Sequence, residues 1–263
     1  ELKQSNTDKL HFGLCKIISD GSIQGFTARL KWPGYYNGSP EGAWYLPPET
    51  LKKIIDAYHA EGMHLHIHTN GDEATEVTIG ALEAALTRNP RTDHRHTLQH
   101  CQMAEEAHFR RMAKLGICAN LFSNHLFYWG DQHFELTMGP DRAARMDATA
   151  TAKRHGIHFG IHSDAPVTPL GPLFTAWCAV NRKTASGRTL GEQEKISVAD
   201  ALHAVTIGAA YTIKLDHLVG SIESGKFADF AVLEDNPYEV APKNLKDVQV
   251  WGTVVGGMTF QGL

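Results

Sequence analysis

The sequence lacks the features that mark several large classes of protein. Its 263 residues carry 25 Lys and Arg against 29 Asp and Glu, with no block of like charge, which argues against a nucleic-acid binder and a polybasic membrane-surface protein. No apolar run approaches the roughly 18 residues that a membrane span needs, and no secretory signal is visible at the start. A hydrophobic content of 42% excludes wholesale disorder. We therefore expect a globular protein that binds neither nucleic acid nor membrane.

Cysteine is also scarce, whereas histidine is abundant. The cysteines are Cys15, Cys101, Cys118 and Cys178, and none forms a CxxC pair. This spacing argues against a disulfide framework and against a thiolate zinc site, and it suits reduced thiols in the cytoplasm. The chain has 16 histidines, so any metal chemistry should rest on imidazole and carboxylate groups.

Short apolar runs alternate with amphipathic segments along most of the chain. We expect strands at residues 14–19, 63–68, 97–101, 117–121 and 157–162, and helices at residues 51–61, 72–87, 105–115, 141–155, 171–181 and 198–210. This alternation predicts an α/β fold built from parallel βαβ units. The tail is rich in Val, Gly and Phe and predicts a small β unit with a hairpin turn at Gly256-Gly257. We divide the chain into residues 1–216 and 217–263.

Side chains of metal-ligand type recur at the ends of the predicted strands. His68 ends the second strand, Asp164 follows the last, and Lys16 lies on the first. In the third strand, alternation places Leu98 and His100 on one face, which we take to be the inward face. The carboxyl ends of parallel strands meet at one edge of a sheet. Ligands that converge there and leave a position for water would suit a hydrolytic metal site.

A resemblance to a known family rests on five segments that occur in this order: KIISDGSIQGFTA, HIHTNGDEA, LQHCQ, HSDAPV and VGSIESGKFADFAVLE. They resemble the amidohydrolase superfamily, and within it the YtcJ-like branch (amidohydrolase family 3). The resemblance implies a (β/α)8 TIM-type barrel, of which this chain would supply about the last five βα units (strands four to eight), followed by a small β-sandwich segment. It also implies a metal-dependent hydrolase that cleaves a non-peptide, amide-like C–N bond of a small molecule with metal-activated water.

The same resemblance assigns roles to individual residues. It makes His68 and His100 metal ligands, and Asp164 both a ligand and the catalytic proton acceptor. Lys16 matches a lysine that the family carboxylates, so that an anionic oxygen ligand replaces an ammonium group. The cofactor is then a divalent metal, with zinc the expected ion and one or two ions per complete barrel.

The sequence departs from the family pattern at three places. The HxH metal pair of the family's first strand is not found before Lys16. We therefore expect an N-terminal half with that pair, in the same protein or another chain, and the complete protein could form a homo-oligomer. Phe26 stands where the branch usually has Arg, and His162 where it usually has Gly. With His125, which follows the fourth strand, these two residues are candidate contacts for the small-molecule substrate.

Structural interpretations remain open for the same residues. His68 and His100 could be buried histidines satisfied by the backbone, and Asp164 could cap a helix. Lys16 could simply pair with Asp20, which is also the alternative ligand.

Other roles remain open for the remaining histidines and for the whole chain. His125 could be a solvated loop residue, and we expect His94, His108, His133 and His155 at the surface. Two alternative functions are a non-catalytic half-barrel subunit with an interaction or regulatory role, and a mononuclear metal-dependent deaminase.

Overall fold

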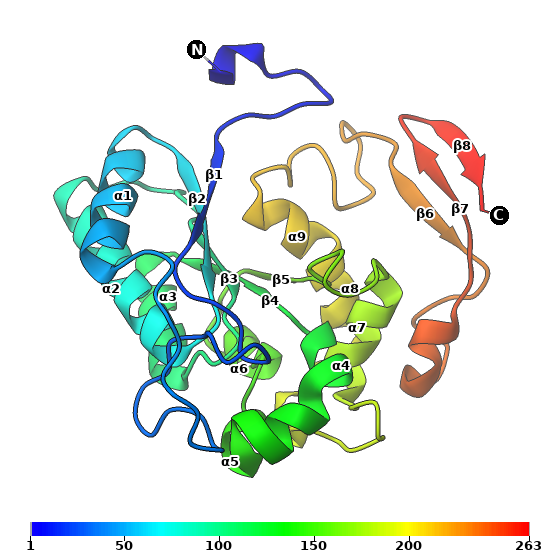
Figure 1. Ribbon diagram of the computed structural model, residues 1–263. Helices are drawn as coiled ribbons and strands as arrows, with labels where there is room; N and C mark the ends of the chain where they lie inside the picture. The colour runs from blue at the N-terminus through cyan, green and yellow to red at the C-terminus, as the bar shows by residue number, and fades with distance from the viewer. Residues whose placement is uncertain (1, 263) are drawn as a thin grey trace.

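The computed structural model describes residues 2–262, with side chains from residue 4 onward (Figure 1). Its centre is a parallel sheet in which neighbours in sequence are neighbours in space, as the alternating pattern predicts. The strands are β1 (Leu14–Ile18), β2 (His64–Thr69), β3 (Thr97–His100), β4 (Cys118–Leu121) and β5 (Phe159–Ile161). The order β1-β2-β3-β4-β5 places all five carboxyl ends at one edge of the sheet.

Helices follow the strands in the predicted alternation. They are α1 (Pro48–Ala60), α2 (Asp72–Arg88), α3 (Glu106–Leu115), α4 (Asn124–Gln132), α5 (Gly139–Ala143), α6 (Thr149–Arg154), α7 (Pro172–Asn181), α8 (Val198–Val205) and α9 (Ile207–Thr212). Short helical turns occupy η1 (Leu2–Ser5), η2 (His133–Thr137), η3 (Glu192–Glu194) and η4 (Pro242–Asp247). Figure 1 shows α1, α2 and α3 beside β1–β3, and α8 and α9 contact β5. None of the helices in the described part of the chain combines the length and apolar character needed to cross a bilayer.

Two of the predicted helices are interrupted. The segment predicted as one helix over residues 141–155 splits into α5 and α6, because Asp147 adopts a φ of +46° that a helix cannot contain. The segment over residues 198–210 breaks at Thr206, whose φ of −118° and ψ of −101° separate α8 from α9. The helical spacing of apolar residues continues across both breaks, so this pattern alone did not reveal them.

One face of the parallel sheet packs against the helices. Leu65, Ile67 and Leu98 are fully buried in the main apolar core together with side chains from α1, α2 and α3. The register pairs Ile67 with Leu98 and His68 with Gln99, so Gln99 shares the inward face with His68. Our expectation that Leu98 faces inward is therefore wrong. His100 nevertheless reaches the inward side, because its φ of +69° turns the chain out of the strand.

The inward face of β1 is open to solvent. Its parity-related residues Leu14 and Ile18 are 43% and 44% exposed, although both are large and apolar. Ile17 points to the opposite face of the strand, where it is 5% exposed and packs in the main core. The face that would line the interior of a closed barrel therefore lacks cover in this part of the sheet.

The tail forms a separate antiparallel sheet. Its strands are β6 (Phe230–Leu233), β7 (Val250–Val255) and β8 (Met258–Gln261), in that order. The predicted turn is confirmed: Gly256 and Gly257 connect β7 to β8 with φ values of +56° and +82°. The domain boundary at residue 216, and a sandwich built around this sheet, stay predictions.

Candidate metal centre

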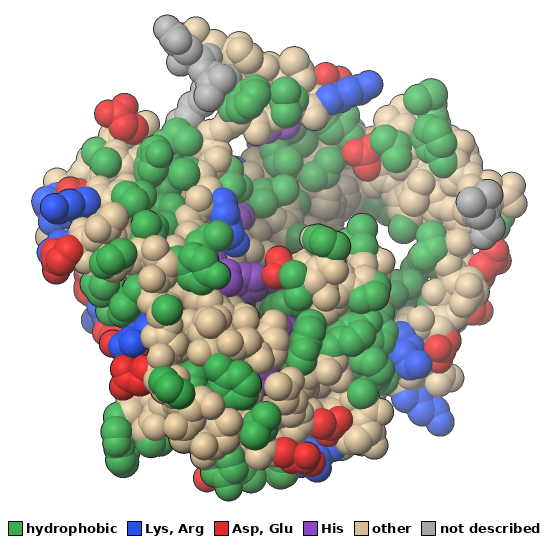
Figure 2. All heavy atoms as spheres, viewed as in Figure 1, with side chains coloured by type: hydrophobic (Ala, Val, Ile, Leu, Met, Phe, Trp, Pro, Cys, Tyr) green, Lys and Arg blue, Asp and Glu red, His purple; other side chains and the backbone are tan. Residues whose placement is uncertain are grey.

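A hollow opens where the five strands end, and ionisable side chains gather in it. Figure 2 shows histidine side chains there, next to side chains of basic and acidic residues. In the described residues, one group of three meets the geometry for a shared metal ion: His100, His162 and Asp164 each offer a donor atom within 4.8 Å of the other two. Two donors on one ion, each at about 2.1 Å, lie at most about 4.2 Å apart, so side-chain movements of less than about 1 Å would bring these three donors onto a shared ion.

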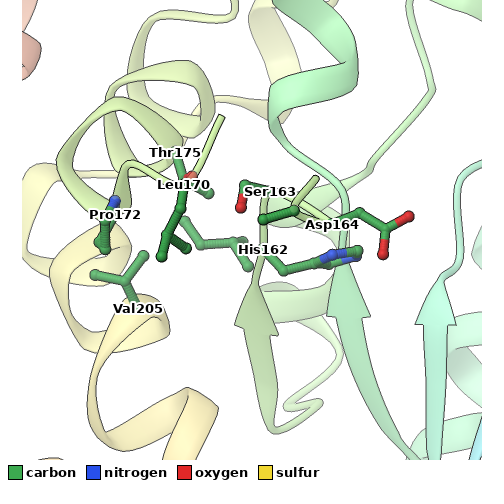
Figure 3. Close-up of a pocket in the computed structure, with 9 residues that line it drawn as sticks. His162, Ser163, Asp164, Leu170, Pro172, Thr175 and Val205 are labelled. Atoms are coloured by element: carbon green, nitrogen blue, oxygen red, sulfur yellow. The ribbon is translucent and has the colours of Figure 1, made fainter. Parts of the chain in front are cut away.

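The two imidazoles of this group have nitrogen atoms without hydrogen-bond partners. His100 Nδ1 and His162 Nε2 are buried and unpaired. Figure 3 shows the side chains of His162 and Asp164 projecting in the same direction from the end of β5. Unpaired buried polar atoms are costly, and a divalent ion such as zinc takes imidazole nitrogen and carboxylate oxygen. The residues present therefore fit the cofactor that the sequence predicted.

Burial keeps these imidazoles in the form that binds metals. It lowers the pKa of His100 well below its ordinary value, and it lowers the pKa of His162 to about 3, with the charge of Lys16 adding to the effect at both rings. Burial also raises the pKa of Asp164, and the positive charge of Lys16 partly offsets this rise. At neutral pH both rings are neutral donors, as metal coordination requires.

His68 borders this group without joining it. Its ring centroid lies 4.5 Å from that of His100. Its Nε2 atom is 2.9 Å from the main-chain oxygen of Gly21 and 3.7 Å from Asp20 Oδ1. Of the four predicted ligands, the structure thus brings His100 and Asp164 together and directs His68 Nε2 toward the loop after β1.

Lys16 and Asp20, which could have formed a pair, have separate environments. Burial lowers the pKa of Lys16, and the carboxylate that offsets this effect is Asp164 rather than Asp20. Asp20 is fully buried and accepts main-chain N–H groups of Arg29, Asn70 and Gly71 at 2.9–3.0 Å. Its oxygens hold two loops together, so the alternative role as a ligand has no support in the geometry.

Asp164 does not cap a helix. The next helix, α7, begins at Pro172 with Gly171 at its N-cap. Asp164 instead has a φ of +51°, and its main-chain oxygen accepts the N–H of Val167 in a turn. The helix-cap interpretation is therefore wrong, and the carboxylate is left facing the histidines.

His125 lies in α4 and is 1% exposed, so the solvated-loop interpretation is wrong. Its Nδ1 contacts the side-chain amide of Gln102, and its Nε2 has no partner. The ring of Phe122 stacks on His125 at 4.3 Å and on His162 at 4.8 Å between centroids. Phe122 and Gln102 were not predicted, because neither carries a ligand-type group.

Phe26 lies apart from the three donor groups. It is partly buried, packs on Tyr35 with ring centroids 5.1 Å apart, and belongs to an apolar cluster that includes Leu30 and Leu126. Its φ of +54° places it at a sharp turn of the long loop between β1 and α1. Its predicted contact with substrate stays a prediction.

Three histidines expected at the surface are buried. His94 Nε2 lies 2.7 Å from the main-chain oxygen of Leu115, and His133 Nδ1 lies 2.7 Å from Thr137 Oγ1. His108 is fully buried between α2 and α3. Each of the three rings makes at least one hydrogen bond inside the protein, whereas His133 Nε2 is buried without a partner; sequence position alone did not indicate this burial.

A cavity of about 300 Å³ adjoins the donor group on the side of the helices. It lies between the end of β5, the start of α7 and α8 (Figure 3). Its lining is mainly apolar, with Leu170, Pro172 and Val205 beside His162 and Asp164. In Figure 3 the imidazole and carboxylate point away from these apolar side chains.

Comparisons with known proteins show the family to which the chain belongs. A family model described as the amidohydrolase family matches residues 1–260. The chain is 31% identical over 263 residues to the putative amidohydrolase YtcJ of Bacillus subtilis, covering 98% of this chain and 48% of that protein. It is 31% identical over 198 residues to an N-substituted formamide deformylase of Arthrobacter pascens, covering 75% of this chain and 36% of that protein.

A solved structure shares the fold. An uncharacterized metal-dependent hydrolase from Pyrococcus horikoshii OT3 aligns with a TM-score of 0.75 at 23% identity, covering 86% of this chain and 45% of that one. The chain thus spans about half the length of the curated relative YtcJ and of this structure. With the family model matched across nearly all of its residues, the chain belongs to the amidohydrolase family.

Proposed function

We propose that the protein is a metal-dependent hydrolase of non-peptide, amide-like C–N bonds in small molecules. The observation that carries this proposal is the convergence of His100, His162 and Asp164 donor atoms at the carboxyl edge of the sheet. We propose zinc as the ion, with Lys16 and His68 completing the ligands when a second ion binds. Such an ion would activate a water molecule and polarise the scissile carbonyl.

Side chains of this protein would transfer the proton from the attacking water to the leaving amine. Asp164 accepts a proton from the attacking water and passes it to the leaving nitrogen, which needs a carboxylate of raised pKa close to the reacting atoms. Burial raises the pKa of Asp164 in this way. We propose that Phe26 and His125 contact the substrate, a role that the unpaired Nε2 atom of His125 supports.

We further propose that this chain supplies strands four to eight of a (β/α)8 barrel, with residues 217–263 forming part of a β-sandwich. The exposed inward face of β1 and the partial coverage of the relatives support this proposal. The remaining strands, with an HxH metal pair, would come from an N-terminal half, and homo-oligomers are compatible with it. The free thiols of all four cysteines support a cytoplasmic location.

The test is metal analysis combined with substitution of His100. The purified protein should contain one or two divalent ions per complete barrel and should release amine from N-formyl or N-acyl compounds. His100→Ala should lose metal and activity together, with activity falling at least about 100-fold, because even residues that only support ligands contribute 10- to 100-fold. The exposed His158, which precedes β5 at its other end, gives the control variant His158→Ala.

Each outcome separates the proposal from its rivals. If His100→Ala keeps both metal and activity, the hydrolase proposal fails. A protein with neither metal nor turnover, even when completed by its N-terminal half, would be the interaction subunit. Release of ammonia from an amino-substituted ring, without amide cleavage, would identify a deaminase.

A further inference from the structure

His162 presents an unpaired ring nitrogen beside the other two donor residues. Its Nε2 is buried and has no hydrogen-bond partner. His162 also offers one of the three donor atoms, with those of His100 and Asp164, that lie within 4.8 Å of one another. A neutral imidazole nitrogen without a partner is a ligand that divalent ions such as zinc take.

Packing holds the ring in this position. Phe122 stacks on His162 with a centroid distance of 4.8 Å and an interplanar angle of 22°. The His100 ring lies 4.9 Å from it on the inward side of the sheet. The ring plane of His162 is thus set before any ligand arrives, and preorganisation of this kind strengthens binding.

The neighbouring His68 shows the opposite arrangement. It also packs on His100, but its Nε2 is directed at the main-chain oxygen of Gly21. Of the two histidines that flank His100, His162 is therefore the one with an unengaged Nε2 in the donor group.

We propose that His162 is a direct ligand of the divalent ion, together with His100 and Asp164. This inference rests on the proposed function only for the presence of the ion, and it gives His162 a coordinating role in place of a contact with substrate. Two imidazoles and one carboxylate from β3 and β5 then leave a fourth position open, as catalytic zinc sites do.

The test is Co²⁺ binding to metal-free protein, which needs no substrate. His162→Gly and His162→Gln remove the imidazole, and His158→Gln is the control at the opposite end of β5, where the ring is exposed and stacks on Tyr211. We expect both His162 variants to bind Co²⁺ at least about 100-fold more weakly, with altered visible absorption, because losing a ligand should exceed the 10- to 100-fold cost of losing a supporting group. His158→Gln should bind as the unaltered protein does.

Chemical rescue distinguishes a ligand from a residue that only packs. Free imidazole should enter the space left in His162→Gly and restore the cobalt spectrum, whereas it should not affect His158→Gln. Binding by both His162 variants within twofold of the unaltered protein, or weak binding without rescue, would overturn the inference. Loss of the native circular dichroism in both variants would also overturn it, because it would assign His162 to packing.

These results are independent of hydrolysis. If Co²⁺ binding depends on His162 but no amide is cleaved, the proposed function fails and the ligand assignment stands. If His162→Gly binds metal normally and hydrolyses amides, the ligand assignment fails and the function stands.

Discussion

Asp20 illustrates how a single buried carboxylate organises the edge of the site. It is fully buried, and its oxygens accept main-chain N–H groups of Arg29, Asn70 and Gly71, which belong to two different loops. Burial raises its pKa to about 6, and these hydrogen bonds oppose that rise. Because Asn70 Nδ2 lies 3.2 Å from His68 Nε2, the hydrogen bonds of Asp20 also fix the surroundings of His68.

Replacing Asp20 should therefore destabilise the whole fold. Asp20→Ala leaves three main-chain N–H groups without acceptors, and each unsatisfied buried donor costs about 1–3 kcal/mol. We expect a loss on the order of 3 kcal/mol in the free energy of unfolding, measured by urea denaturation. The control is Asp56→Ala, which removes an exposed ion pair with Arg88 and should cost at most about 1 kcal/mol. Equal midpoints for the two variants would contradict the anchoring role.

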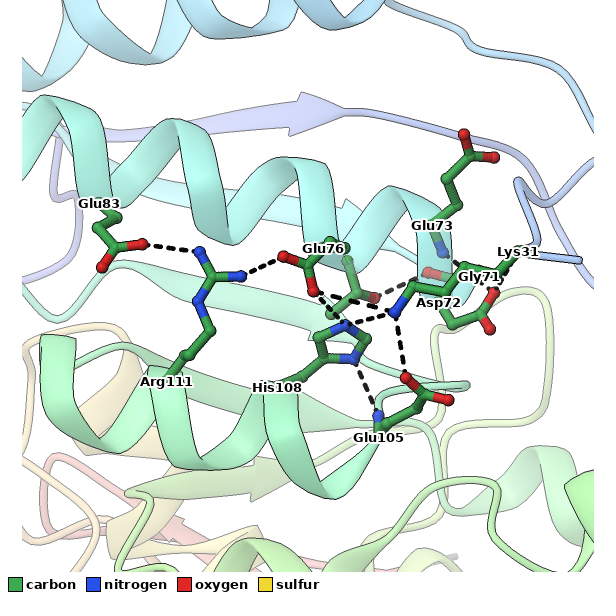
Figure 4. Close-up of polar contacts among 10 residues, drawn as sticks. Lys31, Gly71, Asp72, Glu73, Glu76, Glu83, Glu105, His108 and Arg111 are labelled. Atoms are coloured by element: carbon green, nitrogen blue, oxygen red, sulfur yellow. Dashed lines mark hydrogen bonds and ion pairs between the residues drawn. The ribbon is translucent and has the colours of Figure 1, made fainter.

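At the scale of elements, the loop between β1 and α1 is bound to α2 and α3 by a network of charges. Lys31 is central to it: its main-chain N–H bonds Asp72 at 2.8 Å, and its amine lies 3.1 Å from Glu105 and 3.9 Å from Glu76 (Figure 4). The buried ring of His108 connects the same Glu76 to α3 at 3.0 Å. Several contacts at once thus hold the loop between β1 and α1, which favours a fixed position of this loop beside the site.

The turn from β2 into α2 requires glycine at residue 71. A Cβ there would lie 1.7 Å from the main-chain oxygen of Arg29, since the long loop passes directly against the turn. We expect Gly71→Ala to lower the free energy of unfolding by about 1–3 kcal/mol or more, because main chain cannot move aside cheaply. Thermal unfolding monitored by circular dichroism measures this change.

Gly80, inside α2, provides a control for which we expect the opposite change in stability. A Cβ at Gly80 would have only Arg111 Nη2 within reach, at 4.0 Å. Gly80→Ala should therefore raise the free energy of unfolding by about 0.5–1 kcal/mol, as alanine does in a helix interior. If both glycine variants shift stability in the same direction, the close approach at Gly71 does not control this turn.

The elements and the site were predictable from sequence to different degrees. Strands, most helices and the strand-end positions of His100 and Asp164 follow from periodicity and order, because they depend on local pattern. The inward direction of His100 does not: parity assigns it to the face of Leu98, and only its φ of +69° reverses this. The position of the His162 ring depends on Phe122, which follows the neighbouring strand β4 and stacks on the ring, and no local pattern specifies this contact.

At the scale of the molecule, many histidines are buried in a neutral state. Burial lowers the pKa of His64 and His66 to about 4, of His133 to about 3 and of His96 to about 2. Hydrogen bonds from His64 to the main-chain oxygen of Arg95 and from His66 to that of Thr212 partly oppose this lowering. In the unfolded chain each ring regains an ordinary pKa near 6.5.

Acid should therefore unfold the protein through these histidines. Below pH 6.5 the unfolded chain binds protons that the folded chain refuses, so stability is complete above that pH and falls as the pH drops toward 4. Each buried ring lowers the free energy of unfolding by about 1.4 kcal/mol per pH unit over this range. Asp20, whose pKa is raised to about 6, has the opposite effect, because below pH 6 the folded protein binds one proton that the unfolded chain does not yet bind. Urea denaturation between pH 8 and 5 measures how the free energy of unfolding depends on pH. His64→Gln should reduce this dependence by the contribution of one proton. A midpoint constant down to pH 5 would mean that the rings are charged in the folded state.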